Sequence, residues 1–268
     1  MHCLIDGHAN SCIPADDRGL LYGDALFETI AFKGGKAPLW DWHWRRLHTS
    51  ADQLGIPCPD QGLLLDEALR LAGQGAAIIR ITLTRGSGGR AYWPDQHPEG
   101  RRILLRRDWP TDLNRQRSDG IRLIISQVAL GLHPQLQGLK HGNRLEQVLA
   151  ARECQAAGAD EALLFDTKNH LAEAISSNLL LDIGGQLYTP TSGARVDGVG
   201  LAWLIDQTGD QIQQRIINRE SLGQIGGIMV VNSVAGIRPA VTLDGQPLTI
   251  SGHCRALQSL WNHHFERC

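Results

Sequence analysis

The stretch LKHGNRLEQVLAARE, residues 139–153, places a helical pattern directly after a lysine. Four side chains recur at helical spacing and would share one face of a helix over residues 143–157: Leu145, Val148, Leu149 and Arg152. Asn143 suits the N-cap with Glu146 three residues later, and Gly158 suits the end of the helix. The stretch therefore predicts an amphipathic helix whose first turn closely follows a cation.

That cation, Lys140, stands at the helix end where the backbone dipoles disfavour positive charge. A lysine held there and partly removed from water would have its ammonium form disfavoured. The neutral amine is the form that attacks an aldehyde to make a Schiff base. Lys140 is thus a candidate nucleophile, with an ordinary solvated surface lysine as the alternative.

The composition is that of a globular protein with an ordinary core. The chain has 268 residues, of which 42% are hydrophobic and 20% charged, enough for one large domain or two of usual size. A formal net charge of −2 argues against nucleic acid or a membrane surface as partner, because both call for a basic surplus. The first residues lack the apolar run of a signal peptide, and no stretch is long enough to cross a bilayer, so we expect a cytoplasmic protein.

The cysteines and histidines do not indicate a disulfide framework or a metal centre. Six cysteines lie far apart with no C-x-x-C pair, which favours reduced thiols: Cys3, Cys12, Cys58, Cys154, Cys254 and Cys268. None of the eleven histidines falls in a spacing used by metal ligands. We therefore expect no metal.

The pattern along the chain predicts an α+β fold of two domains. Strands are expected within residues 26–40, 77–86, 101–109, 121–130, 161–166 and 178–190, with tight turns at 32–36 and 183–186. Helices are expected over residues 41–56, 61–75, 143–157 and 200–209, without the strict alternation of a Rossmann sheet. Polar residues 111–120 read as a linker between an N-terminal α+β domain, 1–110, and a C-terminal domain, 121–268.

Several segments have the chemistry of anion sites. Val199 and Gly200 follow Gly198 at a predicted helix start, where backbone N–H groups can receive a phosphate. Asn232 and Ser233 follow a strand. Further polar side chains of this kind are Ser176, Ser177 and Asn178, together with Arg46 on an apolar-patterned helix. Each segment alone is weak evidence, because glycine at a helix start is usually only a cap.

Taken in order, these blocks resemble the fold-type IV pyridoxal-phosphate-dependent enzymes, and within them the aminodeoxychorismate lyases. The resemblance rests on DRGLLYGDALFET (17–29), HWRRL (43–47), TRGSGGRAY (84–92), LKHGNRLEQVLAARE (139–153), ADEALLFD (159–166), LAEAISSNLL (171–180), LYTP (187–190) and NSVAG (232–236). It implies a smaller N-terminal α/β domain, a larger pseudo-barrel-like C-terminal domain, pyridoxal 5'-phosphate as cofactor and a homodimer. The block RGSGGRAY is what favours the lyases over the related aminotransferases.

The resemblance also implies roles for individual residues. Lys140 would form the Schiff base with the cofactor, and Glu173 would keep the pyridine nitrogen protonated. The expected phosphate ligands are Arg46, Val199, Gly200, Asn232 and Ser233, with Ser177 and Asn178 lining the pocket beside Glu173. Arg90 and Tyr92 would meet the substrate, and Arg85, at a strand end, could be structural only.

The implied reaction converts 4-amino-4-deoxychorismate to p-aminobenzoate and pyruvate, a step of folate biosynthesis. The alternatives are an aminotransferase for D-amino or branched-chain amino acids, which would share Lys140 and Glu173, and a non-catalytic protein that binds the cofactor. The sequence departs from the family pattern at Trp203, at the Gly226 and Gly227 pair, and at Ala91, where this block often has glycine. The Ala91 change would matter little if its φ is negative.

Overall fold

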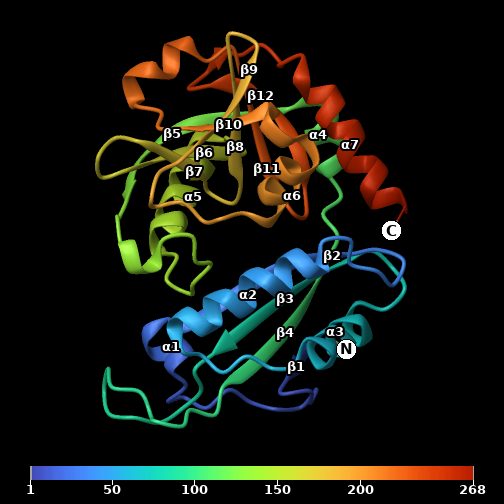
Figure 1. The fold of residues 1–268 in the computed structure, drawn as a ribbon, viewed down its shortest axis with the longest axis vertical. Helices are drawn as coiled ribbons and strands as arrows, with labels where there is room; N and C mark the ends of the chain where they lie inside the picture. Colours follow the sequence, from blue (N-terminus) through green and yellow to red (C-terminus); the bar gives the residue numbers. More distant parts are fainter. Residues whose placement is uncertain (1, 268) are drawn as a thin grey trace. The chain divides into compact units, whose positions relative to one another are not determined.

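The computed structural model describes residues 2–267 and divides the chain into two compact units (Figure 1). Unit 1 holds the residues up to Trp109 together with Leu139–Asn143, and unit 2 holds Pro110–Gly138 and Arg144–Arg267. The short segment that carries Lys140 therefore belongs with the N-terminal residues, although it lies well beyond residue 109 in the chain.

Unit 1 is an antiparallel sheet covered by helices. Its strand order is β1-β4-β3-β2, with β1 Cys3–Ile5, β2 Ala25–Phe32, β3 Ala77–Thr84 and β4 Arg101–Asp108. Its helices are α1 Arg18–Tyr22, α2 Trp40–Leu54 and α3 Gln61–Ala72. Helix α2 packs against β2, and α3 packs against β3 and β4. The predicted strands and helices of this half are confirmed, and only β1 and α1 lack a prediction.

Unit 2 is built on a nine-stranded mixed sheet that curves as a half-barrel (Figure 1). The order is β10-β9-β8-β11-β12-β5-β6-β7, and β13 pairs with β12. The strands are β5 Ile121–Leu130, β6 Glu161–Asp166, β7 Leu171–Ala174, β8 Asn178–Ile183, β9 Gln186–Pro190, β10 Ile212–Arg215, β11 Gly227–Asn232, β12 Gly236–Leu243 and β13 Gln246–Pro247. Buried side chains on these strands, including Leu163, Leu181 and Val230, form a hydrophobic core of unit 2.

The helices of unit 2 are α4 Leu113–Asp119, α5 Leu145–Ala157, α6 Val199–Thr208 and α7 His253–Arg267, with 3-10 turns η1 Pro134–Leu136, η2 Gly209–Gln211 and η3 Arg219–Gln224. Together with the curved sheet they confirm the predicted α+β class with a larger half-barrel domain. The turn Ile183–Gln186 is the expected hairpin, because Gly184 and Gly185 both adopt positive φ, at 61° and 85°.

Residues 111–120, predicted as a linker, contain helix α4 and are part of unit 2. Leu113 is buried, and Arg117 Nε donates a hydrogen bond of 2.7 Å to the Ala235 carbonyl. The segment is polar because α4 is a short surface helix with few inward side chains. Its polarity and its flanking Pro110 and Gly120 are equally typical of a loop, so the pattern alone did not separate the two.

The start of α5 differs from the prediction. The helix begins at Leu145 with Arg144 at the N-cap, and the Asn143 side chain donates to the Gly23 carbonyl at 3.3 Å instead of capping the helix. Glu146 accepts from the backbone N–H of Gly131 at 2.9 Å. The C-terminal prediction is confirmed, because Gly158 adopts the left-handed conformation, with a φ of 63°.

The orientation of α5 is also opposite to its hydrophobic pattern. Leu145 is 77% exposed, and Val148 and Leu149 are exposed as well. The side chains that α5 buries are Gln147, Ala150 and Cys154. The helix packs on β5 and β6 through these three side chains, two of which are small, and its larger apolar side chains lie on the outer face.

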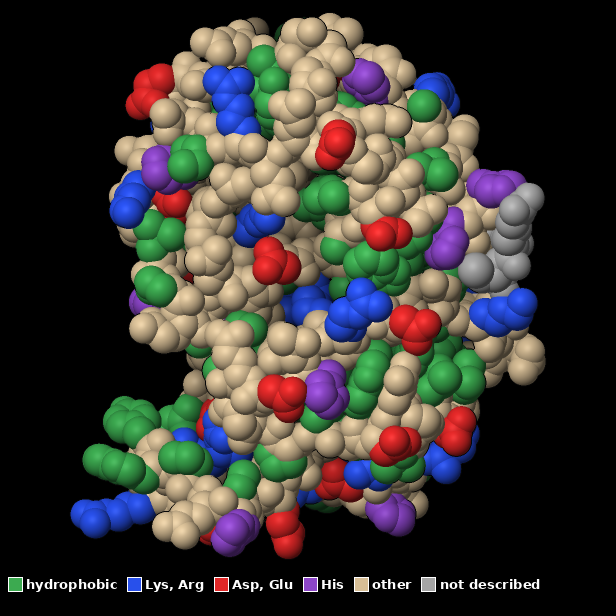
Figure 2. Space-filling model, in the orientation of Figure 1, with side chains coloured by type: hydrophobic (Ala, Val, Ile, Leu, Met, Phe, Trp, Pro, Cys, Tyr) green, Lys and Arg blue, Asp and Glu red, His purple; other side chains and the backbone are tan. Residues whose placement is uncertain are grey.

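Among residues 2–267 no helix combines the length and apolar character needed to cross a bilayer. Over the same residues no cluster of three or more histidine, cysteine or acidic side chains could hold a metal ion. The five described cysteines are free thiols, and Cys268 lies outside the described residues. On the face drawn in Figure 2, basic and acidic side chains are interspersed.

Candidate functional site

Lys140 lies in an extended segment that pairs with the edge of β2 in unit 1. Its carbonyl accepts from the Phe27 N–H at 2.9 Å, and the Gly142 N–H donates to the Ala25 carbonyl at 2.7 Å. The half-buried side chain places Nζ 4.6 Å from the centre of the Phe27 ring. Because α5 begins only at Leu145, the helix-terminus argument for Lys140 does not apply. Backbone pairing and an aromatic face position this amine instead.

A buried charge cluster lies on β2 and α2 of the same unit. Glu28 accepts from Arg46 Nε at 2.7 Å and from Arg46 Nη2 at 2.5 Å, and His43 Nδ1 lies 2.6 Å from Glu28 Oε2. His43 and Arg46 are three residues apart on α2, so both reach the same carboxylate. The two hydrogen bonds to Glu28 fix the plane of the Arg46 guanidinium group.

The electrostatics of this cluster also involve Lys140. Burial would raise the pKa of Glu28, but charge pairing and hydrogen bonds from Arg46 and His43 outweigh it and lower the pKa from 4.5 to about 2. Burial lowers the pKa of His43, and although Glu28 opposes this, the charges of Arg46 and Lys140 add to it. The net effect is a pKa of His43 below its ordinary 6.5. Its Nε2 is buried and has no hydrogen-bond partner within residues 2–267.

In unit 2, Glu173 and Asn178 hold one residue, Val196, from both sides. Glu173 on β7 is 5% exposed, and its Oε2 accepts from the Val196 N–H at 2.8 Å. Asn178 Nδ2 donates to the Val196 carbonyl at 3.0 Å. Gly138 forms a parallel bridge with Val196, and Lys140 follows Gly138 by two residues in the chain. Glu173, Asn178 and Gly138 thus all contact the backbone of the same residue in unit 2.

The predicted phosphate residues of unit 2 lie together. Helix α6 begins at Val199 after Gly198, and a Cβ added to Gly200 would lie 3.1 Å from Asn232 C and 3.2 Å from Ser233 N. The first turn of α6 is therefore backed directly by the turn after β11. The first N–H groups of a helix have no intrahelical partner, and such a cradle fits a phosphate.

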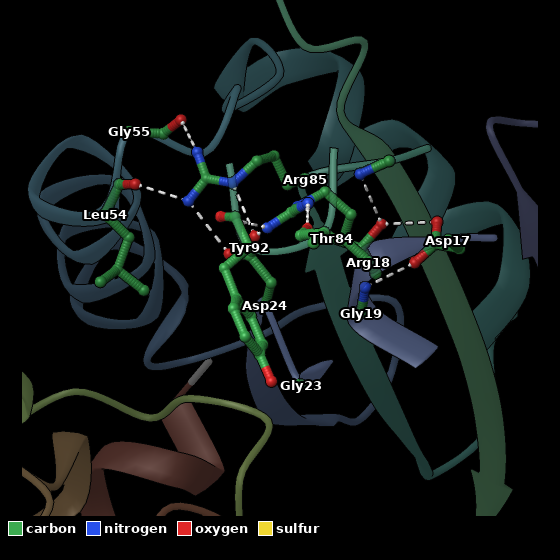
Figure 3. Close-up of polar contacts among 12 residues, drawn as sticks. Asp17, Arg18, Gly19, Gly23, Asp24, Leu54, Gly55, Thr84, Arg85 and Tyr92 are labelled. Atoms are coloured by element: carbon green, nitrogen blue, oxygen red, sulfur yellow. Dashed lines mark hydrogen bonds and ion pairs between the residues drawn. The ribbon is translucent and has the colours of Figure 1, made fainter. Parts of the chain in front are cut away.

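Arginines fix the glycine-rich loop that follows β3 (Figure 3). Arg85 Nε donates to Asp24 Oδ2 at 2.7 Å, and its two terminal nitrogens donate to the Gly55 and Leu54 carbonyls at 2.6 and 2.8 Å. Arg85 is therefore structural. Arg18 Nε also donates to Asp24, at 3.0 Å, which makes this carboxylate the anchor of both guanidinium groups.

Arg18 also forms hydrogen bonds to the loop that contains the predicted substrate-binding residues. Its Nη1 and Nη2 donate to the carbonyls of Ala91 and Tyr92 at 2.8 and 3.1 Å. Arg90 is exposed and Tyr92 is 78% exposed. Ala91 has a φ of +49°, so its change from glycine does put a side chain in a left-handed position, and Arg18 stabilises that strained backbone.

The structure brings most of the predicted residues into two groups. Unit 1 places Arg46 and Lys140 near His43. Unit 2 holds the other residues predicted to bind the cofactor: Glu173, Ser177, Asn178, Val199, Gly200, Asn232 and Ser233. Sequence reasoning missed Glu28, His43 and Val196. A glutamate inside the apolar strand LFETIAF was an available signal, because a buried carboxylate requires a cationic partner. No comparable signal marks Val196, because this residue acts through its backbone.

Comparison with protein families and known proteins gives matches over most of the chain. The family model described as amino-transferase class IV matches residues 25–243. An aminodeoxychorismate lyase of Vibrio harveyi is 29% identical over 88% of this chain and 89% of its own. A putative branched-chain-amino-acid aminotransferase of Methanocaldococcus jannaschii is 30% identical over 86% of this chain and 82% of its own.

Solved structures show the same likeness. The 4-amino-4-deoxychorismate lyase of Pseudomonas aeruginosa is 34% identical, with a TM-score of 0.90 over 97% of this chain and 98% of its own. A hypothetical aminotransferase from Mycobacterium tuberculosis in its PLP-bound form has a TM-score of 0.83 over 98% of both chains. At 20% identity the second likeness concerns the fold alone.

The packing at Gly198 generates a first prediction. A Cβ on Gly198 would lie 1.6 Å from Asn178 Oδ1, so Gly198→Ala must displace the side chain that holds Val196. We expect a loss of roughly 1–3 kcal/mol in unfolding free energy and weaker cofactor binding. Gly223→Ala is the control, because nothing lies within 4 Å of its added Cβ. Urea unfolding should separate the two variants, and equal stability would contradict the close packing of Gly198 on Asn178.

The Glu28 cluster generates a pH prediction. The folded pKa of about 2 lies below the ordinary 4.5, so the ionised carboxylate stabilises the fold above pH 4.5, and this stabilisation is lost as the pH falls from 4.5 toward 2. Glu28→Gln should be less stable than the parent at neutral pH and should show a flatter acid limb. Asp41→Asn, at an exposed position on α2, should leave the limb unchanged. Unfolding free energies measured across this range provide the test.

Proposed function

We propose that this chain, which belongs to the class IV amino-transferase family and takes pyridoxal phosphate as its cofactor, is an aminodeoxychorismate lyase. It would convert 4-amino-4-deoxychorismate to p-aminobenzoate and pyruvate for folate biosynthesis. The observation that carries this proposal is the likeness to the Pseudomonas lyase over nearly the whole of both chains. We further propose that the protein is cytoplasmic and forms a homodimer. Exposed apolar side chains such as Leu20, Leu21 and Trp93 support the dimer.

Two side chains would serve the chemistry directly. Bound pyridoxal phosphate supplies an electron sink for carbanion chemistry. Lys140 would hold the cofactor aldehyde and, once the substrate amine replaces it, take the proton from the substrate carbon that bears the nitrogen. Glu173 would keep the ring nitrogen protonated, and the Val196 N–H on its Oε2 orients the carboxylate for this role.

The phosphate would be bound by backbone groups and one guanidinium. The first N–H groups of α6, at Val199 and Gly200, and the turn at Ser233 form the cradle in unit 2. Arg46 would add a charge-assisted contact. Glu28 holds Nε and Nη2 of Arg46, which sets the plane in which the guanidinium meets an anion.

Substrate recognition is assigned to the glycine-rich loop. Aminodeoxychorismate carries two carboxylates, and Arg90 can contact one of them through two N–H groups. Tyr92 lies beside it on the loop, with its ring 5.3 Å from that of Tyr22. The hydrogen bonds from Arg18 to the carbonyls of residues 91 and 92 would hold both side chains in place for binding.

An aminotransferase is the second candidate, because relatives named branched-chain-amino-acid and D-alanine aminotransferases match over most of the chain. It would use the same Lys140 and Glu173 and differ at the substrate-binding loop. A protein that binds the cofactor without turnover is the third. The three candidates differ in one requirement. A lyase needs no keto acid, because the amino group stays with its aromatic product.

Purified protein supplied with aminodeoxychorismate should release pyruvate and p-aminobenzoate in equal amounts with no keto acid added. The measurement is coupled pyruvate detection alongside chromatography of the aromatic product. A matched reaction contains D-alanine or a branched-chain amino acid plus a keto acid. Product formation only in that second reaction would assign the protein to the aminotransferases, and none in either would favour a non-catalytic binder.

Lys140→Ala should lose the visible absorption of the bound cofactor and slow product formation by at least about 100-fold, since a positioned acid-base group contributes that much or more. Lys168→Ala, which removes an exposed lysine, should behave like the parent. Borohydride treatment followed by peptide mapping should label Lys140 in the parent. A label on another lysine would refute the site, whatever the reaction.

A further inference from the structure

A buried polar network stands behind the phosphate-binding residues of unit 2. Arg238 on β12 donates through Nη2 to Glu161 Oε1 at 3.1 Å and to Ser177 Oγ at 2.9 Å, and Ser177 Oγ donates to Glu161 Oε1 at 2.9 Å. Arg238, Glu161 and Ser177 are each more than nine-tenths buried. The three side chains form a closed triangle away from water.

The hydroxyl of Ser177 is fully used within the protein. A serine hydroxyl has one hydrogen to donate and two lone pairs to accept. Ser177 donates to Glu161, accepts from Arg238, and accepts from Asn232 Nδ2 at 3.1 Å. Ser177 therefore has no capacity left for a cofactor atom, and its contribution to the site is to hold Asn232.

Asn232 links Ser177 to the backbone turn that faces α6. Its Oδ1 accepts from the N–H groups of Val234 and Ala235 at 3.0 and 2.7 Å, which closes the turn after β11. Ser233 lies on this turn, against the first turn of α6 at Gly200. The side chain of Asn232 thus serves to hold the turn, and the groups left to contact a phosphate here are backbone N–H groups and Ser233.

The position of Arg238 is set by strand pairing. Residue 238 is opposite Val230 in the antiparallel pair of β11 and β12, so its side chain reaches the strand end that carries Asn232. Its Nη1 donates to Gln116 Oε1 of α4 at 2.8 Å, while its Nε is buried without a hydrogen-bond partner among the described residues. A buried ion pair with an unsatisfied donor is weak support for stability, which favours a role in placing other groups.

We propose that Arg238 is a positioning residue for the phosphate end of the cofactor, acting through Ser177 and Asn232 on the turn that backs helix α6. The inference rests on the proposed phosphate cradle and not on the lyase reaction. Without the Arg238 guanidinium, Ser177 would lose one of its hydrogen-bond donors, and the turn of residues 232–235 would be held less firmly. We therefore expect the protein to bind the phosphate of the cofactor more weakly, with a smaller effect on binding of the pyridine ring.

The test compares pyridoxal phosphate with pyridoxal, which lacks the phosphate, by equilibrium titration of cofactor-free protein. In Arg238→Met the dissociation constant for pyridoxal phosphate should rise about tenfold, the effect of losing one charge-assisted hydrogen bond, while that for pyridoxal should change less than about threefold. Ser177→Ala should reproduce the selective loss. Arg238→Lys, which keeps the charge without the planar fork, should fall between Arg238→Met and the parent.

Arg102→Met is the matched control, because Arg102 makes two 2.8 Å hydrogen bonds to Glu67 in unit 1 and should affect both ligands equally. Equal weakening of both ligands in Ser177→Ala and Arg238→Lys would reduce Arg238 to a structural residue and overturn the inference. A parent protein with no preference for the phosphorylated ligand would overturn the α6 cradle and this inference together. Neither result depends on whether aminodeoxychorismate is the substrate.

Discussion

The hydrogen bonds on the two sides of Val196 are the constraint on which the proposed cofactor residues of unit 2 depend. Its N–H holds Glu173 and its carbonyl holds Asn178, so the carboxylate and the amide are fixed to one peptide segment. The same segment continues through Gly198 into α6, whose first N–H groups form the proposed phosphate cradle. A shift of this backbone would disturb the Glu173 carboxylate, the Asn178 amide and the start of α6 together, because all three are joined to residues 196–199.

The buried charges of both units follow a common principle. Removing a carboxylate or guanidinium from water is costly unless an opposite charge and hydrogen bonds replace the solvent. Glu28 meets Arg46 and His43 in unit 1, and Glu161 meets Arg238 in unit 2. In unit 1 the pair fixes Arg46 itself, and in unit 2 it fixes Ser177, which in turn holds Asn232. The partners that offset the desolvation cost of these charged groups also fix the orientation of their side chains.

Much of the fold was accessible from patterns in the chain. Alternation and β-branched residues predicted the long strands, and the positive φ of Gly184 and Gly185 followed from a two-residue hairpin. The predictions that failed share a cause. Asn143 bonds to Gly23, far away in sequence, and α5 turns Leu145 outward, because long-range partners outweighed local preference. The short helix α4 was not predicted either, and its contacts with β12 are likewise long-range.

For the site, the amino-acid order alone establishes which residue types are present and how they follow one another: a lysine block, an E-x-x-x-x-N block and a glycine helix start. These sufficed to identify the family, because a set of ordered motifs carries far more information than any one of them. The contacts of each side chain became visible only in the folded chain, where Lys140 lies on the edge of β2, Glu28 binds Arg46, and the hydrogen-bonding groups of Ser177 are all used by its neighbours. A hydrogen-bonding group can serve a ligand only with the capacity that its neighbours leave, and those neighbours come from distant strands.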